Sequence, residues 1–94
     1  MKHAGEQALD ALEDVLEQIR KQKDLKERKR GVFYKGSVAF LHFHEDPSGL
    51  FADLKSGKEW ARYPVGTKSE RREFLLTLLR FQKAEKVPGD RMPI

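Results

Sequence analysis

The 94-residue chain contains no cysteine, which excludes disulfide bonds, thiolate catalysis and every zinc site that uses cysteine ligands. It also lacks long apolar runs: no stretch approaches the roughly 20 residues of a membrane span, and the acidic N-terminal region is not a secretory signal. No GxGxxG, Walker or G-x-S-x-G pattern occurs. We therefore predict a cytoplasmic protein with no cofactor and no membrane partner, and a non-catalytic role is favoured.

Charge is abundant and unevenly distributed. The net charge is +4, yet residues 1–19 hold one base against five acids, and residues 20–30 hold seven bases against two acids. Acids early and bases late complement a helix dipole, so part of this asymmetry has a structural cause. With 38% hydrophobic residues and six phenylalanines, the chain predicts one small domain over residues 1–94, with flexible ends at about 1–4 and 87–94.

Two segments have the apolar spacing of amphipathic helices. Between residues 5 and 22, apolar side chains recur every three or four positions and line one face. Leu25 then stands alone as an anchor in the connecting segment, which Gly31 ends. Thr67-Lys68-Ser69-Glu70 is a capping box that opens a second helix, fading near Lys86. Its predicted buried stripe is Phe74, Leu75, Leu78, Leu79 and Phe81.

Three β-rich runs, at residues 32–35, 38–45 and 50–55, lie between these helices. Asp46-Pro47-Ser48-Gly49 has the residues of a type I turn between the second and third. Residues 60–65 would add a short fourth strand, placed at an edge because Pro64 has no amide proton. The pattern predicts an α+β fold: an antiparallel three- to four-stranded meander flanked by an N-terminal and a C-terminal helix in a two-layer sandwich.

The Asp46–Gly49 turn also predicts a strand register. A four-residue loop pairs Glu45 with Leu50, which places His42 opposite Asp53. Because side chains alternate along a strand, each face then collects its own set, and a one-residue slip would exchange the pairings. The first set, predicted to form the core under both helices, is Leu41, Phe43, Leu50, Ala52 and Leu54. The second set, predicted to stay partly open, is Phe40, His42, His44, Phe51 and Asp53.

Part of this pattern resembles a known group of proteins. The run AFLHFHEDPSGLFADLK, followed by WARYPV and a leucine-rich helix, resembles small uncharacterised bacterial proteins labelled "luciferase family". The similarity extends over residues 36–83. It implies the same α+β arrangement, and we transfer no catalytic residue from it.

His42 and His44 are the candidate ligands for a metal or a small molecule. As alternate residues on one strand they face the same side, with Cβ atoms about 7 Å apart. Two such imidazoles can converge on one divalent metal, and Asp53 across the strand would be a third ligand. The structural alternative is a His42–Asp53 cross-strand pair with His44 packed on Phe51. His3, near the chain end, is not expected to contribute.

The basic run at residues 20–30 is a candidate surface for nucleic acid or another polyanion, since clustered bases release counterions on binding. Its candidate contacts are Lys23, Lys26, Arg28, Lys29 and Arg30. The structural alternative is a solvated connector with interleaved acids. No helix-turn-helix, RNP-like or GxxG pattern supports base recognition.

The sequence thus predicts a small binding or interaction domain, with polyanion binding and a metal or ligand site as alternatives. The mixed sheet face, with Phe40 and Phe51 beside two histidines, further predicts an apolar patch that pairs two copies as a homodimer.

Overall fold

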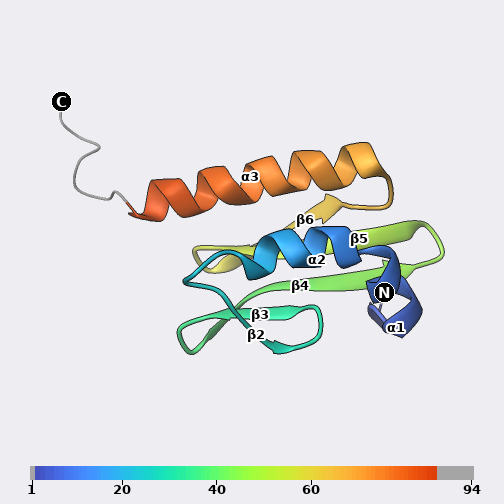
Figure 1. The fold of residues 1–94 in the computed structure, drawn as a ribbon, viewed down its shortest axis with the longest axis horizontal. Helices are drawn as coiled ribbons and strands as arrows, with labels where there is room; N and C mark the ends of the chain where they lie inside the picture. Colours follow the sequence, from blue (N-terminus) through green and yellow to red (C-terminus); the bar gives the residue numbers. More distant parts are fainter. Residues whose placement is uncertain (1, 87–94) are drawn as a thin grey trace.

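The computed structural model describes residues 2–86, so the predicted flexible end at 87–94 lies outside the described residues (Figure 1). Over these residues the chain has an α+β order, in which two short helices precede five consecutive strands and a final helix. In order they are β1 (Lys2–His3), α1 (Glu6–Ala11), α2 (Glu13–Arg20), β2 (Lys26–Lys29), β3 (Val32–Lys35), β4 (Val38–Asp46), β5 (Gly49–Ser56), β6 (Glu59–Pro64) and α3 (Lys68–Lys86). No helix within residues 2–86 is long and apolar enough to cross a membrane.

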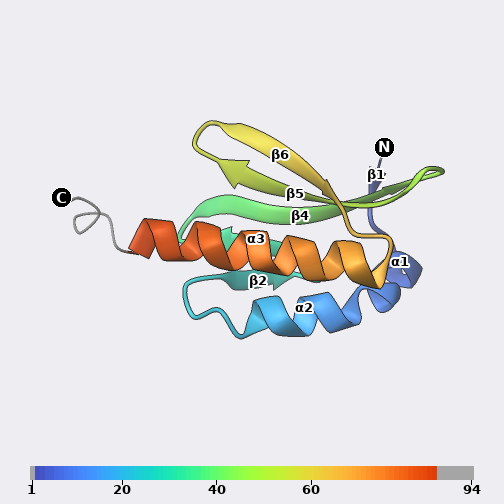
Figure 2. The same ribbon diagram turned by 90° about the horizontal axis from the view of Figure 1, so that it is seen from above.

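The strands form one antiparallel sheet with the neighbour order β2-β3-β4-β5-β6, and β1 pairs separately with β4. The helices lie on one side of this sheet, as Figure 2 shows. This confirms the predicted α+β fold class, with an antiparallel sheet and helices in the N- and C-terminal regions.

The core lies between the helices and the sheet. The helix side contributes Leu12, Leu16 and Ile19 from the first helical region, all with no exposed surface, together with Phe74 and Leu78 from α3. The sheet side contributes Phe33, Leu41, Phe43, Ala52 and Leu54. Most residues of the predicted core face are therefore buried as predicted. The burial of their large apolar side chains drives the packing of the helices on the sheet.

The predicted register between β4 and β5 is also confirmed. Glu45 pairs with Leu50, His42 with Asp53 and Leu41 with Leu54. Asp46 Oδ1 accepts hydrogen bonds from the Ser48 amide (2.8 Å) and hydroxyl (2.5 Å), which close the turn. The turn thus sets which β4 and β5 side chains share a face.

The predicted capping box opens α3. The Glu70 amide donates to Thr67 Oγ1 (3.0 Å), and the Thr67 amide donates to Glu70 Oε1 (3.1 Å). Along the helix, Phe74 and Leu78 are buried as predicted, but Leu79 is 46% exposed, so the predicted stripe was wrong there. The side chain of Phe81 lies outside the described residues.

The N-terminal half differs from the sequence prediction in three ways. The single predicted helix is interrupted at Leu12, which separates α1 from α2. Residues 26–29, expected to be part of a connector, form the edge strand β2. Residues 2–3, placed in a flexible end, form β1 on β4. Both missed strands are short and polar, so their own sequences carry no apolar alternation to predict them.

Phe40 was assigned to the wrong face. Phe33 pairs with Leu41 and Tyr34 pairs with Ala39, so Phe40 is an extra residue in a β-bulge. The bulge brings Phe40 into the same core cluster as Leu41, with 4% of its surface exposed. The apolar patch predicted to pair two copies therefore loses one of its two phenylalanines.

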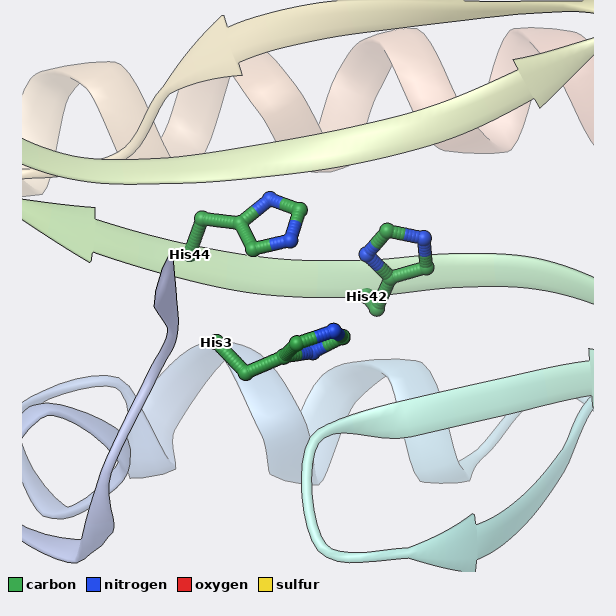
Figure 3. A group of neighbouring side chains, drawn as sticks. All are labelled: His3, His42 and His44. Atoms are coloured by element: carbon green, nitrogen blue, oxygen red, sulfur yellow. The ribbon is translucent and has the colours of Figure 1, made fainter. Parts of the chain in front are cut away.

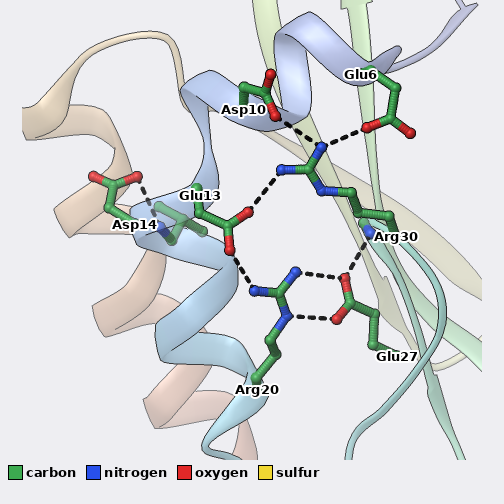
Figure 4. A network of polar contacts seen from close by, with 9 residues as sticks. Glu6, Asp10, Glu13, Asp14, Arg20, Glu27 and Arg30 are labelled. Carbon is green, nitrogen blue, oxygen red and sulfur yellow. Dashed lines mark hydrogen bonds and ion pairs between the residues drawn. The ribbon is translucent and has the colours of Figure 1, made fainter.

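An ion-pair network ties β2 to the helices (Figure 4). Arg20 contacts Glu13 (2.6 Å) and Glu27 (2.5 Å), and Arg30 contacts Glu6 (2.5 Å), Asp10 (2.9 Å) and Glu13 (2.8 Å). Hydrogen bonds from Arg30 and Arg20 lower the pKa of Glu13. Two bases of the run at residues 20–30, Arg20 and Arg30, are thus paired with acids of the first helical region and of β2.

Gly31 occupies the tight connection between β2 and β3. Its φ is +80°, and an added Cβ would lie 2.6 Å from Leu9 Cδ2 in the core. We expect Gly31→Ala to destabilise the protein by about 2–4 kcal/mol, from backbone strain plus this overlap. The free energy of unfolding from urea denaturation measures this loss.

Gly36→Ala is the matched control. Its φ of +65° imposes similar backbone strain, but no described atom beyond its two chain neighbours lies within 4 Å of the added Cβ. A loss of about 1–2 kcal/mol is expected from strain alone. Equal losses at the two positions would show that Leu9 does not resist the added methyl group.

Candidate metal centre

Three histidines from two strands meet on the sheet face opposite the helices. Pairing of β1 with β4 places His3 directly opposite His44, and His42 is two residues further along β4. One potential ligand nitrogen from each ring lies within 4.8 Å of the others. Figure 3 shows the rings gathered in one group, with His42 and His44 each directing a nitrogen toward the other.

The ring distances describe a close cluster. Centroids are separated by 4.8 Å for His3 and His44, 4.9 Å for His42 and His44, and 5.5 Å for His3 and His42. The alternation of β4 explains why His42 and His44 share a face, as the sequence predicted. The third imidazole, His3, was missed, because only the tertiary pairing of β1 brings it here.

Two nitrogens of the cluster are buried without a hydrogen bond. Nδ1 of His42 and Nδ1 of His44 are inaccessible to solvent, and neither has a hydrogen-bond partner among the described residues. Buried polar atoms without partners are uncommon in folded proteins, and coordination of an ion is one established way to satisfy them. A metal ligated by His42 Nδ1 would satisfy the first of these atoms.

The second buried nitrogen, Nδ1 of His44, lies next to the carboxylate of Asp53. Its Oδ2 lies 3.0 Å from His44 Nδ1, close enough for an ion pair but not aligned as a hydrogen bond. A carboxylate beside one ring nitrogen orients an imidazole and leaves the other nitrogen, Nε2, to face a metal. Asp53 is therefore better placed to orient His44 than to ligate the ion itself, in contrast to the sequence prediction.

Arg62 fixes Asp53 from β6. Its Nε and Nη2 donate to Oδ1 (2.7 Å) and Oδ2 (2.8 Å), a bidentate pair. These hydrogen bonds lower the pKa of Asp53, although burial opposes the change. Asp53 is thus a permanent anion beside the cluster at neutral pH, and only 8% of its side chain is exposed.

The environment keeps the two β4 histidines neutral. Burial lowers the pKa of His42, and repulsion from His44, when that ring is protonated, lowers it further. Burial also lowers the pKa of His44, with Asp53 acting in the opposite direction. Neutral imidazole is the form that coordinates metals, so both rings are in the competent state at pH 7.

Trp60 borders the cluster. Its ring lies 4.5 Å from the ring of His42, and 41% of its surface is exposed. Phe51, the other aromatic residue predicted at this site, pairs with His44 across the strands and is half-buried. Since Trp60 is the single tryptophan of the chain, it is a built-in fluorescent reporter for this face.

The donor set fits a borderline divalent ion. Three neutral imidazoles suit zinc, copper or nickel, with Zn–N distances of about 2.0–2.1 Å. A tetrahedral site of that size separates its ligand atoms by roughly 3.3 Å. The nitrogens, now within 4.8 Å of one another, must therefore approach by up to about 1.5 Å. His3 is exposed on a two-residue strand, so its ring has the freedom to move.

The bases of the predicted polyanion surface differ in their contacts. Arg30 is engaged by three acids, and Arg28 stacks on Tyr34 (5.0 Å) while donating to the Gly36 carbonyl (3.4 Å). Lys23, Lys26 and Lys29 remain exposed. The five bases predicted as one surface thus have different environments, and the histidine cluster is the more specific arrangement.

Replacing Asp53 with asparagine tests its role in the metal-free protein. We expect a loss of about 1–2 kcal/mol of stability at pH 7, because the charge-assisted bonds to half-exposed Arg62 are weakened. Urea denaturation in the presence of a chelator measures it. Glu59→Gln, an exposed change on β6, is the control and should shift stability by less than about 0.5 kcal/mol.

The chain matches no protein family, and no curated protein or solved structure is detectably similar to it. The resemblance to the "luciferase family" proteins therefore stays a prediction.

Proposed function

We propose that this protein is a small metal-binding domain that holds one late first-row divalent ion, with Zn²⁺ the first candidate, between His3, His42 and His44. The observation that carries the proposal is the convergence of three imidazoles whose ligand atoms lie within 4.8 Å of one another. Nδ1 of His42 is also buried with no hydrogen-bond partner among the described residues. The sequence predicted a small binding domain, and the proposal names a divalent metal ion as its ligand.

A purely structural role for the cluster accounts for less. Structural histidines satisfy their buried nitrogens with hydrogen bonds, whereas His42 Nδ1 has none among residues 2–86. Neighbouring residues also fix the orientation of the His44 ring, since Arg62 donates two hydrogen bonds to Asp53 and Asp53 contacts His44. That arrangement corresponds to the carboxylate–histidine–metal relay of metal sites.

The proposal is one of binding rather than catalysis. Three protein ligands leave a fourth position for water, as in catalytic zinc sites. A hydrolytic reaction would also need a free general base near that water. Asp53 contacts the cluster, but Arg62 engages both of its carboxylate oxygens, so it is not free to act as that base.

A titration with Zn²⁺ at pH 7.5 tests the proposal. Calorimetry should give one ion per chain with a Kd of about 10 μM or tighter, and the fluorescence of Trp60 should change in parallel because its ring packs on His42. Cu²⁺ should quench the same fluorescence. Binding weaker than about 1 mM, or a stoichiometry far from one, would contradict the proposal.

Metal binding should weaken as the pH falls. Protons compete with the ion for imidazole nitrogens, so affinity is full above the histidine pKa values and decreases as pH drops through them. Burial lowers the pKa of His42 and of His44, so these two ligands compete with protons only at a lower pH than a free imidazole does. Calorimetry at pH 7.5 and pH 5.5 checks this, and equal affinities would argue against histidine ligands.

A further inference from the structure

We infer that the metal is a clip for the first strand: ion binding controls whether β1 is attached to β4, and so whether the adjacent edge of β4 is covered. This inference rests on the metal site proposed above. A metal could bind at this site without changing how firmly β1 is attached, so the attachment is a separate property that needs its own test.

The three ligands come from elements of very different size. His42 and His44 belong to a nine-residue strand that is paired with β3 and β5. His3 belongs to a two-residue strand that is exposed at both positions. A short, exposed strand end is the part of a fold most prone to local opening.

Few described contacts hold β1 in place. Besides the cross-strand pairs of Lys2 with Glu45 and His3 with His44, the Ala4 amide donates to the Phe43 carbonyl (3.0 Å). The Gly5 amide donates to Glu45 Oε2 (3.0 Å) in an exposed bond. Each hydrogen bond contributes only about 0.5–1.5 kcal/mol net. Ala4 packs against the core, but Lys2 and His3 are exposed, so β1 itself is weakly held.

β1 covers a stretch of β4 that β3 does not reach. Pairing between β3 and β4 ends at Val32 and His42, and β1 begins to pair at His44. When β1 leaves, the Phe43 carbonyl loses its donor and the edge from Phe43 to Glu45 opens. An open strand edge can pair with a strand of another chain. Attachment of β1 therefore controls whether this edge of β4 is available for such pairing.

An ion that needs all three imidazoles binds the attached form better than the open form. By linkage it must shift the equilibrium toward attachment, and attachment must strengthen ion binding by the same factor. The ion therefore fastens β1, and loss of the ion releases it.

Amide exchange measured by NMR tests the clip. The Ala4 amide reports on β1, and the Val65 amide, which donates to the Leu50 carbonyl (2.9 Å), is the reference away from β1. Saturating Zn²⁺, compared with a chelator, should raise the ratio of Ala4 to Val65 protection at least about tenfold. His3→Ala should abolish the rise.

A reciprocal variant tests the same coupling without touching a ligand. Glu45→Ala removes the acceptor of the Gly5 amide and should weaken Zn²⁺ binding about fivefold. Glu59→Ala, which removes an exposed acid of β6, is the charge-matched control and should leave the affinity unchanged.

The outcomes separate the clip from the site. If calorimetry detects Zn²⁺ binding but the Ala4 to Val65 ratio does not change, the clip is wrong and the proposed metal site stands. If Zn²⁺ does not bind at all, both fail. If Glu45→Ala binds as tightly as Glu59→Ala, β1 attachment is not coupled to the ion and the clip is likewise wrong.

Discussion

Replacing His42 with alanine is expected to weaken Zn²⁺ binding at least about 100-fold, because it removes one of three ligands from the rigid strand β4. Even the loss of an outer partner typically weakens a metal site 10–100-fold. His44→Ala should have an effect of the same size. His3→Ala should have a smaller effect, since His3 is exposed and its two-residue strand must be held in place for it to bind.

The control for this series is Trp60→Phe. It keeps an aromatic ring beside His42 and supplies no metal ligand, so calorimetry should detect an affinity within about threefold of the unmodified protein. If His42→Ala instead binds Zn²⁺ as tightly as Trp60→Phe does, the ion lies elsewhere on the chain and the assigned site is incorrect.

Replacing Phe43 with alanine is expected to remove about 3–5 kcal/mol of the free energy of unfolding. Phe43 is 2% exposed and packs edge-on against Phe74 of α3, with ring centroids 6.3 Å apart. The substitution leaves a cavity where the sheet meets the helix. For a domain whose total stability is about 5–15 kcal/mol, this loss approaches unfolding.

Phe51→Ala is the matched control for Phe43→Ala. Phe51 is the same residue type on the neighbouring strand, but it lies on the opposite face and is half-buried. Urea denaturation should give a loss of no more than about 2 kcal/mol, with a similar denaturant slope. A larger loss at Phe51 than at Phe43 would show that the histidine face, not the helix face, carries the main core.

Local sequence was sufficient where neighbouring residues decide the structure. Asp46 and Gly49 specify a turn whose length dictates the β4–β5 register, so the shared face of His42, His44 and Asp53 followed from counting residues. Thr67 and Glu70 specify the start of α3 through bonds within one helical turn. In both cases the interacting groups are only a few residues apart.

Tertiary structure alone decided the features that depend on distant partners. Lys2–His3 has no strand pattern of its own and becomes a strand only because Glu45 and His44, more than 40 positions away, supply the pairing groups. Phe40 turns into the core because β3 is one residue short of β4 at the bulge. The sequence by itself therefore determined two of the three histidines of the site, and long-range strand pairing added the third, since hydrogen bonds between distant segments leave no periodic trace in either one.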